Sequence, residues 1–71
     1  MNNNFSKLLG ERLITITTVH NETGIARSTL VGLYYRRTQN VKFDTLRKLC
    51  DYLQVPLSTL IEYTPQPMVN Q

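Results

Sequence analysis

One short stretch decides the fold of this chain: Thr23-Gly24-Ile25-Ala26. A glycine that follows a helix readily takes the left-handed conformation that ends it, so we expect one helix to end at Gly24. Ile25 is apolar and turns into the core, and a second helix starts near Ala26 or Arg27. The stretch therefore predicts two helices joined by a tight turn.

The segment before the turn allows two interpretations. Residues 14–19 are β-branched throughout, and by propensity alone they form a strand candidate. However, a single strand has no partner elsewhere in the chain, and Thr15 suits the N-cap of a helix. Ile16 and Val19 then share one helical face. We expect a helix over residues 15–22.

Apolar spacing predicts three further helices, which begin at residue 4, at Asp44 and at Pro56. The first covers residues 4–12, and the polar residues 36–40 form a loop. The side chains expected to face the core are Phe5, Leu8, Leu9, Leu13, Ile16, Val19, Ile25, Leu30, Leu33, Tyr34, Val41, Phe43, Leu46, Leu49, Cys50, Leu53, Leu57, Leu60 and Ile61.

Five short helices predict an all-α bundle with crossed axes. The expected domain covers residues 1–63. A flexible tail covers residues 64–71, because Pro65 and Pro67 do not sustain a helix.

Composition narrows the class of function. The chain has 71 residues, with one cysteine and one histidine, so it lacks an internal disulfide and a four-ligand Cys/His zinc site. No nucleophile, base and orienting group stand out together, so we expect neither an enzyme nor a cofactor. Because no apolar run approaches the roughly 18 residues that span a membrane, and no signal peptide precedes the domain, we expect a cytoplasmic protein without a membrane partner.

Positive charge is concentrated in the middle of the chain. The formal net charge is +3, but residues 27–48 carry +5 and the remainder carries −2. Such a patch suits a polyanion, most simply nucleic acid. An ordinary solvated face is the alternative.

A helix, a turn with glycine and a second helix form the helix-turn-helix pattern, whose second helix lies in the major groove of DNA. The chain resembles the Cro and phage-repressor type of helix-turn-helix family, which has the lambda-repressor-like fold. The resemblance rests on residues 44–63, which look like that family's fourth and fifth helices, and on Ile14, Thr15, Val19, His20 and Thr23-Gly24-Ile25-Ala26. It implies a compact five-helix domain that binds double-stranded operator DNA.

Carried over by position, the resemblance implies nine DNA-binding residues. Arg27 and Ser28 would face bases, Thr29 would lie near a base or phosphate, and Val31 would lie beside a thymine methyl group. The backbone contacts would come from Tyr35, Arg36, Arg37, Asn40 and Lys42.

Three positions depart from the family pattern. Ile16 stands where a glutamine usually holds a phosphate, and Ala26 replaces the usual serine or threonine cap at a cost of about 1 kcal/mol. Gly32 stands at a position that often carries a base-contacting side chain. Val31 and Tyr35 are also expected to face outward. The outward side of the helix-turn-helix is therefore also predicted to bind a protein, through an interface formed by Ile16, Val31, Gly32 and Tyr35.

Two functions follow. The first is a Cro-like transcriptional regulator, acting as a homodimer in a phage-type genetic switch. The alternative is an antirepressor or modulator that forms a heterocomplex with a larger repressor and masks its DNA-binding domain. His20 is interpreted as a packing residue rather than a pH sensor, and Cys50 as a buried thiol rather than a redox sensor. Tyr52 and Tyr63 are candidates for a protein contact.

Overall fold

Five helices and one short strand pair make up the residues that the computed structural model describes, 2–38 and 40–62. This architecture confirms the expected all-α fold. The expected tail, residues 64–71, lies outside the described residues. In chain order the elements are β1 (Asn2–Asn3), α1 (Phe5–Arg12), α2 (Ile16–Thr23), α3 (Arg27–Tyr34), α4 (Phe43–Leu53), α5 (Leu57–Leu60) and β2 (Ile61–Glu62).

Local signals set the ends of α2. The Thr15 hydroxyl accepts a hydrogen bond from the backbone N–H of Thr18 at 3.1 Å, which satisfies one of the free donors of the first turn. At the other end Gly24 has a φ of 75° and its N–H bonds to the carbonyl of His20. Both expectations are confirmed, and residues 16–19 are helical rather than extended.

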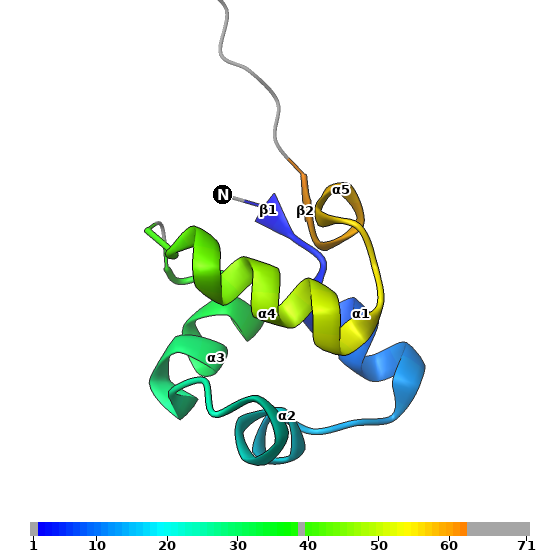
Figure 1. Cartoon of the computed structure of the whole chain (residues 1–71), viewed down its shortest axis with the longest axis vertical. Helices are drawn as coiled ribbons and strands as arrows, with labels where there is room; N and C mark the ends of the chain where they lie inside the picture. Colours follow the sequence, from blue (N-terminus) through cyan, green and yellow to red (C-terminus); the bar gives the residue numbers. More distant parts are fainter. Residues whose placement is uncertain (1, 39, 63–71) are drawn as a thin grey trace, which may run out of the picture.

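The helices pack with crossed axes around one core (Figure 1). The helix pair α2 and α3 packs together, α1 contacts α3, and α4 contacts both α2 and α5. Among the described residues, no helix is long and apolar enough to span a membrane. The buried core consists of Phe5, Leu8, Leu9, Val19, Ile25, Leu30, Leu33, Leu46, Leu49, Leu53 and Leu60.

A strand pair that was not predicted joins the two ends of the domain. Strand β1 pairs with β2 in antiparallel register, Asn3 opposite Ile61. Asn4 adds two bonds, from its backbone N–H to the carbonyl of Leu60 and from its amide Nδ2 to the carbonyl of Thr59. The buried Asn3 side chain accepts from the N–H of Phe5 at 2.9 Å. These bonds connect the start of α1 to α5.

Several expectations about the core are wrong. Leu13 is 91% exposed, because it ends α1 in the left-handed conformation and points away from the face that Leu9 shares. Phe43 is 66% exposed, since it occupies the first position of α4 while Leu46 and Leu49 take the inward face. Leu57 likewise lies at the exposed start of α5.

Helices α1 and α5 each start one residue later than expected, because Asn4 and Pro56 serve as their N-caps. Thr15 is the N-cap of α2, as expected, so this helix covers residues 16–23 rather than 15–22. Helix α4 starts one residue earlier than expected, at Phe43.

Candidate nucleic-acid interface

Hydrogen bonds within the turn hold α3 at a set angle to α2. The Thr23 hydroxyl donates to the carbonyl of Val19 at 2.7 Å and accepts from the N–H of Ile25 at 3.2 Å. The Nδ1 atom of His20 lies 2.7 Å from the carbonyl oxygen of Ile25. Ile25 itself is 5% exposed. The turn is therefore anchored by hydrogen bonds to its backbone and by the buried side chain of Ile25. His20 is half-buried and contributes one of these hydrogen bonds.

Helix α3 has one buried and one outward face. Leu30 and Leu33 are buried, while Arg27 and Ser28 are exposed at its start. Thr29 and Val31 are half-buried at the edges of the helix. The N-cap, Ala26, makes no side-chain bond, so the expected loss of a cap is confirmed. The first turn of α3 therefore presents its backbone N–H groups together with Arg27 and Ser28.

Gly32 was expected to face outward, but the structure places Thr38 against it. A Cβ placed on it would lie 3.3 Å from the Cβ of Thr38, because the chain folds back over this side of α3. The Gly32 carbonyl accepts from the N–H groups of Arg37 at 2.8 Å and Thr38 at 3.4 Å. Arg36, with a φ of 58°, makes the reversal. Glycine at this position lets the segment that carries Arg36 and Arg37, here called the basic loop, lie close against the helix.

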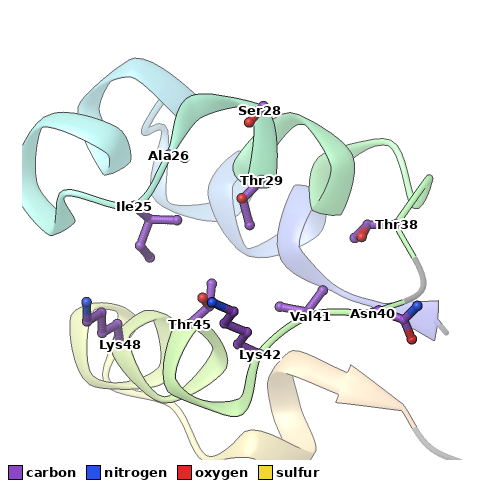
Figure 2. Close-up of a pocket in the computed structure, with 10 residues that line it drawn as sticks. All are labelled: Ile25, Ala26, Ser28, Thr29, Thr38, Asn40, Val41, Lys42, Thr45 and Lys48. Atoms are coloured by element: carbon purple, nitrogen blue, oxygen red, sulfur yellow. The ribbon is translucent and has the colours of Figure 1, made fainter.

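A cleft of about 460 Å³ separates the start of α3 from the start of α4 (Figure 2). The side chain of Thr29 points into it from α3, and Thr45, Lys42 and Lys48 line it from the other side. Seven of the ten lining residues carry a hydroxyl, amide or ammonium group, and three are apolar. The full set of lining residues is Ile25, Ala26, Ser28, Thr29, Thr38, Asn40, Val41, Lys42, Thr45 and Lys48.

The cleft brings together four expected site residues, Ser28, Thr29, Asn40 and Lys42. It adds three polar residues that sequence reasoning missed, Thr38, Thr45 and Lys48. The sequence spacing could have indicated two of them, Thr45 and Lys48. Residues 42, 45 and 48 follow each other at intervals of three, so they share one side of a helix with the predicted site residue Lys42. Their placement opposite α3 depends on the packing of α4.

Ion pairs neutralise part of the charge on α4. Arg47 bonds to Asp44 at 2.7 Å and lies 3.7 Å from Asp51, while Lys48 lies 3.6 Å from Asp44. The hydrogen bond from Arg47 lowers the pKa of the Asp44 carboxyl below its ordinary value. In the described part of the chain, six cations have no carboxylate within salt-bridge distance, namely Lys7, Arg12, Arg27, Arg36, Arg37 and Lys42. Four of these six, Arg27, Arg36, Arg37 and Lys42, are exposed residues that were predicted to bind DNA.

The two tyrosines at the end of α3 have different surroundings. Tyr34 is half-buried and packs edge-on against Phe5, whereas Tyr35 is 57% exposed. The guanidinium of Arg37 lies over the Tyr35 ring at 5.1 Å from its centroid. This cation–π contact keeps Arg37 beside the helix end without neutralising its charge.

A second groove, of about 360 Å³, lies where α2 begins and α3 ends. It is lined by residues 14–17 with Tyr34 and Tyr35. The structure thus brings Ile16 and Tyr35 of the expected protein interface together. The expected interface also includes Val31 and Gly32, which are not among the described residues that line this groove.

Two remaining candidates, Cys50 and Tyr52, line neither of these surfaces. Cys50 is half-buried against the core, and burial raises the pKa of its thiol, which favours the packing interpretation. Tyr52 donates its hydroxyl hydrogen bond to Glu22, so it connects α4 to α2, and Tyr63 lies outside the described residues. Within residues 2–38 and 40–62, no three His, Cys, Asp or Glu side chains gather to hold a metal ion.

The fold and the exposed start of α3 define a helix-turn-helix DNA-binding domain. The family model for the Cro/C1-type helix-turn-helix DNA-binding domain matches residues 4–66, and the chain belongs to this family. Comparison with curated proteins and with solved structures gives no match. The chain is therefore a DNA-binding regulator of Cro/C1 type, and the resemblance drawn from the sequence is confirmed.

Proposed function

We propose that this chain is a sequence-specific transcriptional regulator that recognises operator DNA with the exposed face of α3. The observation that carries the proposal is the exposure of Arg27 and Ser28 on the first turn of an anchored recognition helix. An arginine pairs bidentately with guanine, and a serine hydroxyl bonds to several bases. The half-buried Val31 offers apolar contact to a thymine methyl group at the helix edge.

The phosphate contacts are proposed to come from the basic loop and the cleft beside it. Arg36, Arg37 and Lys42 are exposed and lack acidic partners in the described chain, so each keeps a full positive charge. Thr29 and Asn40 line the cleft next to Lys42, where their polar groups suit phosphate oxygens (Figure 2). This arrangement supports the nucleic-acid interpretation of the charge patch over the solvated-face alternative.

We further propose that the regulator acts in the cytoplasm as a homodimer within a phage-type switch. One recognition helix covers only a few base pairs, and two-fold pairs of such helices bind half-sites about 34 Å apart. The selected DNA should then be a palindrome with this spacing. The proposed protein is a binding protein without catalytic activity.

Selection from a random duplex pool followed by quantitative gel shift tests the proposal. Arg27→Ala should weaken binding to the selected motif by about 1–3 kcal/mol and relax the base preference at one position of the motif. Lys42→Ala should weaken binding to all DNA sequences by a similar factor. It should also lower the slope of the logarithm of the association constant against the logarithm of the salt concentration by about 1. Arg47→Ala is the matched control, because its guanidinium is already paired on α4, and it should leave both quantities unchanged. The proposal is falsified if the wild-type chain enriches no motif and shows no salt-sensitive binding.

A second candidate function is supported by the groove at the start of α2. Ile16 and Tyr35 offer apolar and aromatic surface there, where a dedicated DNA-binding protein would place polar groups. A chain of this kind would bind the DNA-binding domain of a larger repressor and act as an antirepressor. Titration of a repressor encoded nearby, with Ile16→Asp as the groove variant, tests it. This function is supported if the wild-type chain binds the repressor and Ile16→Asp does not. It is refuted if the wild-type chain does not bind the repressor at micromolar concentration.

A further inference from the structure

The first residue of α3 is connected to the first turn of α2 by a side-chain hydrogen bond. The Nη1 atom of Arg27 donates to the Thr17 hydroxyl at 3.3 Å. The two residues are ten apart in sequence, and the turn at Gly24 brings them together by placing the starts of both helices on one surface. Both side chains are exposed. Water can replace such a bond at little cost to the fold, so its main consequence is the orientation of Arg27.

The partner of Arg27 is a side-chain hydroxyl on a neighbouring helix, unlike the partners of Arg47 and Arg12. Arg47 is bonded to a carboxylate, and Arg12 donates to the backbone carbonyl of Leu53. A hydroxyl fixes one N–H of the guanidinium but leaves its charge intact. The Nε–Nη2 edge stays available for a bidentate contact to a guanine or a phosphate.

We propose that Thr17 is a specificity-determining residue that acts by positioning Arg27 for base recognition. This inference rests on the proposed function of α3. A free arginine side chain loses rotamer freedom when it binds a base, and an arginine already held loses less. Thr17 therefore raises affinity for the correct sequence without itself touching the DNA bases.

The test uses the DNA motif that the wild-type chain selects from a random duplex pool, together with a scrambled duplex. Thr17→Val keeps the β-branched shape but removes the acceptor. It should lower affinity for the motif by about three- to tenfold while leaving affinity for the scrambled duplex and the melting temperature unchanged. Thr17→Ser keeps a hydroxyl and should restore most of the affinity. Thr59→Val, the same change on the exposed surface of α5, is the matched control and should have no effect.

A double-mutant cycle separates positioning from an independent contact. If Thr17 acts through Arg27, then Thr17→Val should cost nothing further in an Arg27→Ala background, and both variants should lose discrimination at the same base position. Additive losses, or a Thr17→Val variant that keeps the wild-type ratio of motif to scrambled affinity, overturn this inference alone. A wild-type chain that enriches no motif overturns the proposed function as well, so the two failures are distinguishable.

Discussion

The same substitution, glycine to alanine, should have opposite effects at two positions of this domain. Gly24 ends α2 with a φ of 75°, whereas Gly10 lies inside α1. A Cβ added at either position meets nothing within 4 Å, so steric contact with other residues does not enter the comparison. What remains is the backbone conformation that each position requires.

The expected magnitudes follow from that difference. At Gly24 an L-residue in the left-handed conformation costs about 1–2 kcal/mol, offset by about 0.4–1 kcal/mol because alanine restricts the unfolded chain. Gly24→Ala should therefore destabilise the domain by about 0.8 kcal/mol at the midpoints of these ranges, and by at most about 1.6 kcal/mol. Gly10→Ala should stabilise it by about 0.5–1 kcal/mol, since alanine is the better helix former.

Thermal unfolding followed by circular dichroism measures both effects. In a domain of this size each kcal/mol shifts the melting temperature by roughly 4–8 °C, so the two variants should fall on opposite sides of the wild type. DNA affinity of Gly24→Ala, measured well below its melting temperature, should stay close to the wild-type value because the folded turn is unchanged. Shifts of the same sign for both variants would refute the reasoning, since the conformational requirement at Gly24 would then not decide the outcome.

Two further predictions concern the ends and the surface of the helices. Leu13 has a φ of 56° and is 91% exposed, so Leu13→Gly should stabilise the domain by about 0.5–1 kcal/mol in urea unfolding. Leu13→Ala keeps the backbone cost, and an equal gain from it would show that the exposed side chain matters instead. In an NMR pH titration the Asp44 carboxyl should titrate below its ordinary value, and Arg47→Ala should raise its pKa. Because that pKa is lowered on folding, this carboxyl stabilises the fold at pH values above its ordinary pKa, near 3.8. The stabilisation is lost as the pH falls through the folded pKa. An Asp44 pKa that stays low in Arg47→Ala would contradict the assigned cause.

Local sequence signals were sufficient for the helix-turn-helix itself. The N-cap at Thr15, the left-handed glycine at Gly24 and the inward Ile25 each act within a few residues of chain, so their effect can be predicted without the rest of the fold. The apolar spacing along α4 likewise predicted Leu46 and Leu49 in the core. These signals also placed Arg27 and Ser28 on the outward side of α3.

Only the tertiary structure decided which surfaces the helices share. The spacing put Leu13 and Phe43 on apolar faces next to predicted helix ends, but it could not show that the chain leaves the core at both ends. In the same way, Gly32 was expected outside, but the loop after α3 folds back and brings Thr38 against it. Periodicity reports the face of one helix, whereas burial depends on what packs against that face.

The sequence by itself determined that a recognition helix follows a glycine turn and that positive charge gathers after it. The tertiary structure decided how that charge is arranged, because the packing of α4 places Thr45 and Lys48 across a cleft from Thr29. It also placed Thr17 within hydrogen-bond distance of Arg27. Contacts between residues far apart in the chain depend on the angles between packed helices, and those angles follow from the whole core rather than from any one segment.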